Sequence, residues 1–310
     1  MNTKTNARIE RIAVIGAGTM GRQIAALAAS GGYPVAIFDA APGAVERARQ
    51  MLAAELPDVV IEYQWPASVE SILEQIAPAD TLEEAVADAD LVIEAVRENL
   101  ETKRVVFAEL AAAAAPTAIL ATNSSSLPSA RIAGAIPDAS RLLNTHFFTP
   151  IWQRPMLEIM SSGTTDPEII DACAAWGREL RLTVAMCQGQ SMGFIINRIW
   201  RAVKRESLRV VDEGHATPED IDRLWMRFFD SDFGPFGMMD TVGLDTVSDI
   251  ERSYVAVSTD PADRVSTTLK EMVELGHLGE KTGQGFYGHP NPAYRQAGFL
   301  TGDTNSDQEC

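Results

Sequence analysis

A histidine and an acid stand twelve positions apart in an apolar run of this 310-residue chain. His146 is one of four histidines, and Glu158 lies between Leu157 and Ile159 in LNTHFFTPIWQRPMLEIM, residues 143–160. Histidine can take a proton near neutral pH, and a carboxylate bonded to its other ring nitrogen fixes the tautomer and stabilises the imidazolium. If a turn at TPIWQRP folds the two segments together, the pair could act as an acid–base unit. The spacing also allows a histidine satisfied within a core.

A glycine-rich turn near the start of the chain could bind a dinucleotide. GAGTMG fits GxGxxG, with Gly16 for the tight turn, Gly18 for approach of the phosphates and Gly21 for close helix packing. Asp39 ends the second predicted strand, where a carboxylate can bond ribose hydroxyls and would repel a 2′-phosphate. These features predict an NAD site, and the alternative is a purely structural turn capped by Asp39.

The elements that must position these residues alternate between strand and helix. Short apolar, β-branched-rich runs predict strands, and the segments between several of them have helical spacing. The predicted strands are 11–15, 34–39, 90–95, 118–124 and 141–148. Such alternation predicts a parallel, doubly wound sheet of the Rossmann type, an α/β fold. After the turn QGQSMG the strand signal fades, and apolar residues recur at helical spacing in 194–212, 218–229, 238–256 and 263–276.

We therefore expect three parts. Residues 1–190 should form the dinucleotide-binding domain, 191–290 an all-helical domain for substrate binding and dimerisation, and 291–310 a loose polar tail.

Composition excludes several classes of function. The formal net charge of −17 would repel nucleic acid and anionic lipid, so neither kind of partner is expected. No apolar stretch has the length of a membrane span, which predicts a cytoplasmic protein. The three cysteines are scattered without metal-ligand spacing, so neither a metal site nor a disulfide framework is predicted.

Ten short motifs, in order along residues 10–288, resemble the L-3-hydroxyacyl-CoA dehydrogenase family, including the 3-hydroxybutyryl-CoA dehydrogenases. They are VIGAGTMG, DLVIEAVRENLETK, ATNSSSL, THFFTP, LEI, GFIINR, EDIDR, GPF, VGLDT and LGEKTGQGFY. The resemblance implies an NAD-dependent oxidoreductase acting on a CH–OH group, a place in fatty acid metabolism, and a homodimer formed through the helical domain.

The resemblance also implies roles for individual residues. It makes His146 the catalytic base oriented by Glu158, lets Ser125 bond the reacting oxygen, and has Asn197 help to hold the substrate carbonyl. On the cofactor side it implies contacts, beyond the glycine turn and Asp39, from Met20, Glu98, Lys103 and Asn123.

The chain departs from the family where coenzyme A would bind. Many relatives have a lysine-rich helical region after the second strand, whereas residues 53–77 here are acidic and contain no lysine. Arginine can instead clamp a free carboxylate bidentately, and Arg154 and Arg201 are candidates, although pairing with surface acids is an alternative for each. Trp152 could narrow a pocket for a compact or aromatic substrate.

Three functions stay open at this point. The chain could oxidise a 3-hydroxyacyl thioester reversibly to the 3-keto compound, or perform the same chemistry on a free hydroxy acid. The third alternative is a catalytically inert dinucleotide-binding or structural protein. The first two require a small-molecule substrate.

Overall fold

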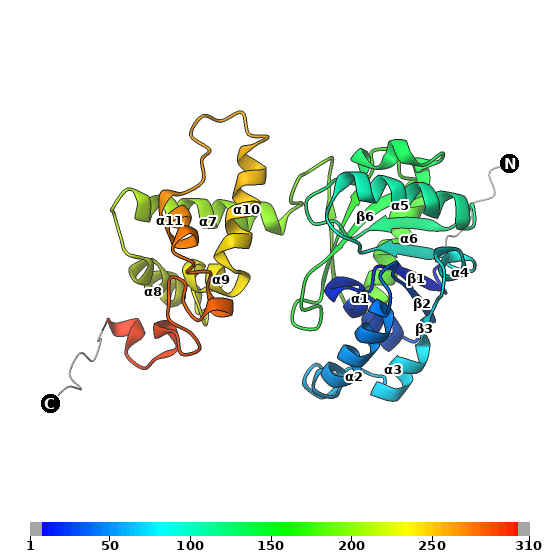
Figure 1. Ribbon diagram of the computed structural model, residues 1–310, viewed down its shortest axis with the longest axis horizontal. Helices are drawn as coiled ribbons and strands as arrows, with labels where there is room; N and C mark the ends of the chain where they lie inside the picture. The colour runs from blue at the N-terminus through cyan, green and yellow to red at the C-terminus, as the bar shows by residue number, and fades with distance from the viewer. Residues whose placement is uncertain (1–7, 303–310) are drawn as a thin grey trace. The chain divides into compact units, whose positions relative to one another are not determined.

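The computed structural model describes residues 8–302 and divides into two compact units, the first ending at Ile195 and the second beginning at Ile196. The first unit contains a sheet covered by helices, and the second is built from helices joined by loops (Figure 1). Within the described part of the chain, no helix is long and apolar enough to cross a membrane.

The sheet has eight strands in the order β3-β2-β1-β4-β5-β6-β7-β8. Its strands are β1 Ile12–Ile15, β2 Val35–Phe38, β3 Ile76–Pro78, β4 Leu91–Glu94, β5 Ile119–Thr122, β6 Leu142–Phe147, β7 Met156–Ser161 and β8 Thr183–Cys187. The strands β1 to β6 are parallel, so the predicted doubly wound sheet is confirmed. The sequence patterns did not identify β3 and β8, and the pair β7 and β8 runs antiparallel to β6.

The helices of the first unit bury apolar faces against both sides of this sheet. They are α1 Thr19–Ser30, α2 Ala44–Glu62, α3 Val69–Gln75, α4 Leu82–Val86, α5 Leu100–Ala113 and α6 Pro167–Glu179. One core packs α1, α2, α3 and α6 on one face, and a second packs α4 and α5 on the other. Because both faces are covered, β1, β4 and β5 are apolar almost throughout, as parallel strands require.

The second unit is helical, as expected. Its helices are α7 Ile196–Asp212, α8 Pro218–Phe229, α9 Pro235–Val242, α10 Leu244–Val255 and α11 Thr267–Glu274. The single helix predicted over 238–256 is wrong: Gly243, with φ of +94°, separates α9 from α10. This positive φ is accessible to glycine and strained for other residues, so the chain bends here while the apolar spacing continues.

The predicted loose tail is also wrong over 291–302. Tyr294 and Phe299 are 4% and 8% exposed and pack into the core of the second unit around Tyr287. Their burial anchors two short 3₁₀ turns, Ala293–Arg295 and Phe299–Thr301. The remainder of the predicted tail, 303–310, lies outside the described residues.

Candidate active site

The glycine turn joins β1 to α1 with the geometry of a phosphate-binding loop. Gly16 has φ of +106°, and a Cβ there would lie 2.6 Å from the carbonyl oxygen of Ala95. A Cβ on Gly21 would lie 1.7 Å from the carbonyl oxygen of Gly16, whereas a Cβ on Gly18 would meet open space. Gly18 is the N-cap of α1, so the first amides and the positive dipole end of the helix lie beside that space. The residues present therefore fit a pyrophosphate.

Asp39 ties the end of β2 to this turn. One carboxylate oxygen accepts the N–H of Ala17 and the other accepts the N–H of Ala41, each at 2.8 Å. The acid is thus fixed next to the glycine turn, where the ribose of a dinucleotide is expected. Met20, in the first turn of α1, packs against the apolar core between this helix and the sheet.

Two alanine substitutions are expected to separate the packing of the turn from its binding role. Gly21→Ala should lower both the melting temperature and NADH affinity, because its Cβ cannot fit against Gly16. Gly18→Ala should leave the melting temperature nearly unchanged and weaken NADH binding by about tenfold or more, since the methyl group occupies the space that the phosphates need. Thermal unfolding and NADH fluorescence titration measure the two quantities. Normal NADH affinity in Gly18→Ala would place the dinucleotide elsewhere.

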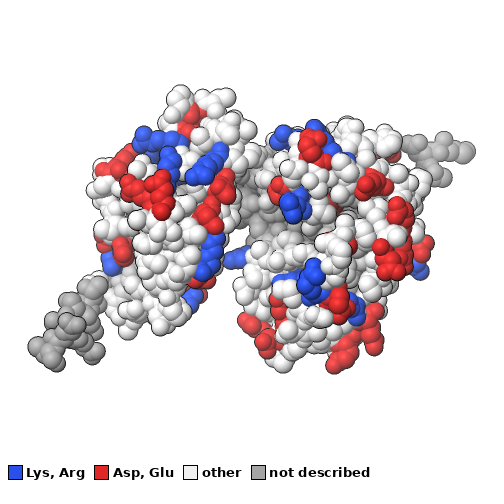
Figure 2. Space-filling view, in the orientation of Figure 1, with Lys and Arg blue, Asp and Glu red and all other residues white. Residues whose placement is uncertain are grey.

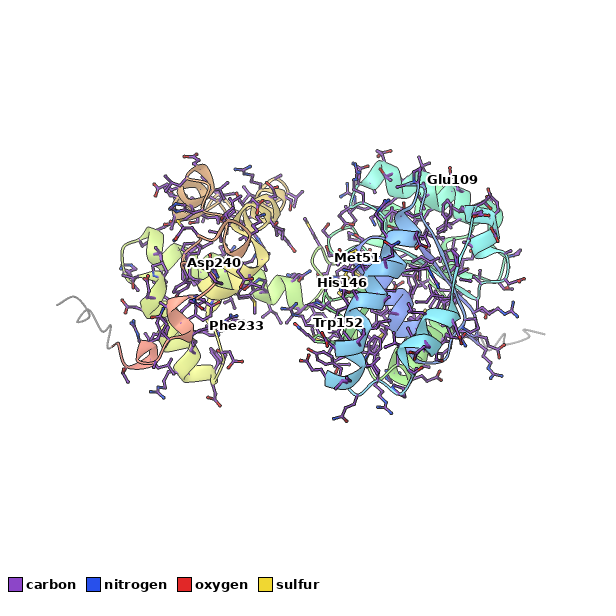
Figure 3. The ribbon with its side chains drawn as sticks, turned by 60° about the horizontal axis from the view of Figure 1, so that its bottom comes forward. Met51, Glu109, His146, Trp152, Phe233 and Asp240 are labelled. Carbon is purple, nitrogen blue, oxygen red and sulfur yellow. The ribbon has the colours of Figure 1, made fainter. Side chains whose placement is uncertain are left out.

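His146 and Glu158 lie opposite each other on neighbouring antiparallel strands. The β6–β7 register pairs the two residues, and Nδ1 of His146 lies 2.9 Å from Oε2 of Glu158. Both side chains are buried, with 4% of each residue exposed. Because a carboxylate only accepts hydrogen bonds, Nδ1 is the donor and Nε2 is the nitrogen left to exchange a proton. Figure 3 labels His146 within the first unit.

A buried ion-pair cluster lies at the ends of β4 and β5. Nζ of Lys103 lies 2.6 Å from Oε1 of Glu94 and 3.2 Å from Glu98, and Thr122 donates its hydroxyl to Glu94. Ser124 and Ser126 donate their hydroxyls to Glu98. Burial acts to raise the pKa of Glu98, but Lys103 and the serine hydroxyls outweigh it and lower that pKa. Lys103 is itself only 1% exposed, so it acts on the edge of the sheet through these two carboxylates.

The sequence patterns did not single out Glu94 or Gln23, although both organise the site. Glu94 also accepts the N–H of Val96, which shapes the loop after β4. Gln23, in α1, accepts the N–H of Ile151 at 3.1 Å and the hydroxyl of Thr149, which anchors the loop after β6. The sequence did contain a signal for Glu94, because this acid ends an apolar strand and precedes Lys103 by nine residues. Nothing in the sequence pointed to Gln23.

Asn123 and Ser125 follow β5, next to the strand that carries His146. Asn123 accepts the N–H of Phe147 at 3.0 Å, so its side chain joins β5 to β6. Ser125 is exposed two residues further on, just past the carboxyl end of β5. A hydroxyl at this edge of a parallel sheet is placed where ligands of such folds bind.

Asn197 and Arg201 belong to α7 of the second unit, whereas His146 belongs to the first. Arg201 is already engaged: its guanidinium lies 2.7 Å from Asp263 and 3.1 Å from Glu251, and it stacks on Tyr254. The predicted role of Arg201 as a clamp for a substrate carboxylate is therefore wrong, since its charge is satisfied within its own unit. The alternative of pairing with acids describes it correctly.

Arg154 and Trp152 lie in the loop between β6 and β7. Arg154 donates to the carbonyl oxygen of Thr149 in the same loop. Trp152, labelled in Figure 3, packs edge-to-face on Trp65 with ring centroids 6.4 Å apart. Both tryptophans line a cavity of about 270 Å³ together with Leu27, Pro66 and Leu180, and His146 is not among its lining residues. The predicted placement of Trp152 in the substrate pocket is therefore not supported.

The first unit thus combines a dinucleotide-type glycine turn with a buried, hydrogen-bonded histidine and glutamate on the same sheet. A hydride acceptor and a proton acceptor are the two groups that oxidation of an alcohol requires. Across residues 8–302, no three or more His, Cys, Asp or Glu side chains are grouped to hold a metal ion.

Comparison with known proteins agrees with this arrangement. Residues 11–190 match the model for the 3-hydroxyacyl-CoA dehydrogenase NAD binding domain, and residues 193–289 match that for the 3-hydroxyacyl-CoA dehydrogenase C-terminal domain. The 3-hydroxybutyryl-CoA dehydrogenase of Mycobacterium tuberculosis is 33% identical over 90% of this chain and 98% of its own length.

Two solved structures extend the comparison. (S)-3-hydroxybutyryl-CoA dehydrogenase from Ralstonia eutropha superposes with a TM-score of 0.84 at 28% identity, covering 91% of this chain and all of that one. A diketoreductase described as acting on dicarbonyl compounds superposes with a TM-score of 0.80 at 30% identity, covering 91% of this chain and 99% of its own. The chain belongs to the 3-hydroxyacyl-CoA dehydrogenase family of NAD-dependent oxidoreductases.

Proposed function

We propose that the protein oxidises a 3-hydroxyacyl compound reversibly to the 3-keto compound, with His146 and Glu158 as the acid–base pair. The observation that carries this proposal is the 2.9 Å hydrogen bond between the two buried side chains, on a sheet whose first turn is built for a dinucleotide.

The chain's own residues then have distinct tasks. Bound NAD supplies the acceptor for the hydride that leaves the carbinol carbon. Nε2 of His146 takes the hydroxyl proton, and Glu158 stabilises the positive charge that this creates on the ring. Ser125 donates a hydrogen bond to the reacting oxygen, and Asn197 is proposed to hold the substrate carbonyl. Gly16, Gly18, Gly21 and Asp39 would bind the dinucleotide, while Lys103 keeps Glu94 and Glu98 in place.

A thioester and a free acid differ in the group attached to the acyl part: the thioester carries coenzyme A, and the free acid carries a carboxylate. The family names and the M. tuberculosis relative favour a coenzyme A thioester, whereas the diketoreductase favours dicarbonyl compounds. Helices α2 and α3 carry Glu46, Glu55, Asp58, Glu62, Glu70 and Glu74. Figure 2 shows acidic side chains prominent where these helices lie in Figure 1.

Three arginines on or beside those helices already have partners within the first unit. Arg22 pairs with Glu55 at 2.6 Å, Arg49 donates to the carbonyl oxygens of Leu73 and Ile76, and Arg47 donates to the carbonyl oxygen of Pro42. A coenzyme A nucleotide carrying several negative charges gains little compensation from such a surface. We therefore propose that the substrate is recognised mainly through its acyl part.

An NADH-absorbance assay should show this directly. With acetoacetyl-CoA, free 3-keto acids and compact diketones at matched concentration, we expect the free compounds to reach a kcat/KM at least comparable with that of the thioester. Turnover with the thioester alone would contradict recognition through the acyl part and would show that coenzyme A binds without a lysine patch. No turnover with any of these compounds, together with normal NADH binding, would favour the inert dinucleotide-binding protein.

We propose further that the enzyme is a homodimer formed through the second unit. Large apolar side chains are exposed on α7 and α8: Ile199 at 56%, Leu224 at 71%, Phe228 at 83% and Phe229 at 55%. Large apolar side chains exposed on two helices that pack together are typical of an interface. A cytoplasmic location is also proposed, and the buried thiol of Cys173, which forms no disulfide, is compatible with a reducing compartment.

A further inference from the structure

The first unit ends in a tight turn, residues 191–195, that lies against the acid–base pair. Gly193 has φ of +75° and Phe194 has φ of +53°, a left-handed conformation that is uncommon for an aromatic residue. Ser191 holds the turn closed from both directions: its carbonyl accepts the N–H of Phe194, and its hydroxyl donates to the carbonyl of Phe194, each at 3.1 Å. A strained backbone held in this way is a reason to ask what it positions.

The turn reaches Glu158 through a backbone amide. The N–H of Ile195 donates to Oε1 of Glu158 at 3.1 Å, while Oε2 accepts from His146 at 2.9 Å. The last torsion of a glutamate side chain is broad, so each hydrogen bond to its oxygens narrows the range of carboxylate orientations. The Ile195 amide therefore helps to fix the carboxylate plane, and with it the orientation of the imidazole.

The turn also places an aromatic ring beside His146. Phe194 is 2% exposed, and its ring centroid lies 5.0 Å from that of the imidazole at an interplanar angle of 32°. Phe148 packs on the imidazole as well, with centroids 4.3 Å apart. The two phenyl rings restrict rotation of the imidazole about its own bonds and exclude water from its faces.

We propose that the turn 191–195 is a positioning element for the acid–base pair, acting through the Ile195 amide on Glu158 and through the Phe194 ring on His146. The proposal rests on the proposed function of that pair. Since α7 begins at Ile196, the amide that fixes Glu158 belongs to the last residue before the second unit. The orientation of the base is thereby tied to the conformation of the junction.

The decisive variant replaces Ile195 with its α-hydroxy acid by nonsense suppression, which turns the amide into an ester. This removes the N–H of Ile195 and weakens the Phe194 carbonyl that accepts the Ser191 hydroxyl, so both effects act on the turn. We expect kcat to fall by about tenfold or more, because the base is no longer held in line, with unchanged NADH affinity. In the nucleotide-free protein, the downfield Nδ1–H proton resonance of His146, assigned by its absence in His146→Gln, should shift or broaden. Phe194→Leu should change kcat and the resonance in the same direction.

Phe147→Leu is the matched control for Phe194→Leu, because it also replaces a buried aromatic ring with a smaller side chain. Phe147 lies on β6, the strand that carries His146. Phe147 points to the opposite face of the sheet, where it packs on Trp176 with centroids 6.2 Å apart. The Phe147→Leu variant should lower the melting temperature as Phe194→Leu does. It should leave both the His146 Nδ1–H resonance and kcat as in the wild type. Because the resonance is read without nucleotide or substrate, it tests the turn even if the wild type proves inert.

The proposal is overturned if the ester variant retains the wild-type resonance, or if the resonance changes while kcat does not. A loss of activity in Phe147→Leu equal to that in Phe194→Leu would likewise overturn it, because general loosening of the strand would then explain both.

Discussion

Replacing His146 with alanine is expected to lower turnover by at least about a hundredfold, the scale for losing a general base. The imidazole is the group proposed to receive the hydroxyl proton, and alanine leaves Glu158 without its partner at 2.9 Å. The glycine turn follows β1 and Asp39 follows β2, whereas His146 lies on β6, so NADH affinity should stay nearly the same. Steady-state kinetics with the best substrate and an NADH titration check the two statements.

His215→Ala is the matched control, because that histidine is largely exposed and its contact is with Glu213 at 3.4 Å. It should have wild-type kinetics. A His146→Ala variant with near-normal turnover would remove His146 from the mechanism. A wild type that binds NADH and shows no turnover that this variant abolishes would favour an inert dinucleotide-binding protein.

Local patterns predicted the sheet well because parallel strands covered on both faces are short, apolar and separated by helices. The glycine turn was readable for a similar reason, since Gly16 and Gly21 are each required by a backbone contact close by. By contrast, β3 is three residues long and lies at an edge, and β8 is only partly buried, so neither has a strong apolar pattern.

The pairing of His146 with Glu158 was predictable because only a short loop separates their strands. The partners of Arg201 were not, since Glu251 and Asp263 follow it by 50 and 62 residues and reach it through packing of the second unit. The contact of Trp152 with Trp65 was not predictable for the same reason, because the two residues are far apart in sequence. Contacts set by tertiary packing are not visible in local spacing.

In the predicted tail, composition suggested too little order rather than a wrong contact. A polar composition suggested a loose segment, yet Tyr294 and Phe299 are sufficient to anchor it in the core. Two large aromatic side chains can outweigh many polar neighbours, because each buries a large apolar area.

Replacing Lys103 with methionine is expected to destabilise the first unit by about 3–5 kcal/mol, the cost of breaking a buried ion pair from one side. Nζ of Lys103 lies 2.6 Å from Glu94, and the two side chains are 1% and 0% exposed. Methionine fills most of the volume, so the loss comes chiefly from a carboxylate left buried without its cation. Urea unfolding followed by tryptophan fluorescence measures the change.

Two further variants decide whether the charge is the cause. Lys281→Met breaks a pair with Asp245 whose side chains are 47% and 40% exposed, and should cost less than about 1 kcal/mol. Glu94→Gln combined with Lys103→Met should recover much of the loss, because the amide carries no charge, its oxygen can accept the N–H of Val96 and its NH2 can donate to the hydroxyl oxygen of Thr122. If the double variant is as unstable as Lys103→Met alone, lost packing rather than an unpaired charge is responsible. Because Glu94 also shapes the loop after β4, NADH affinity should fall in Lys103→Met and remain unchanged in Lys281→Met.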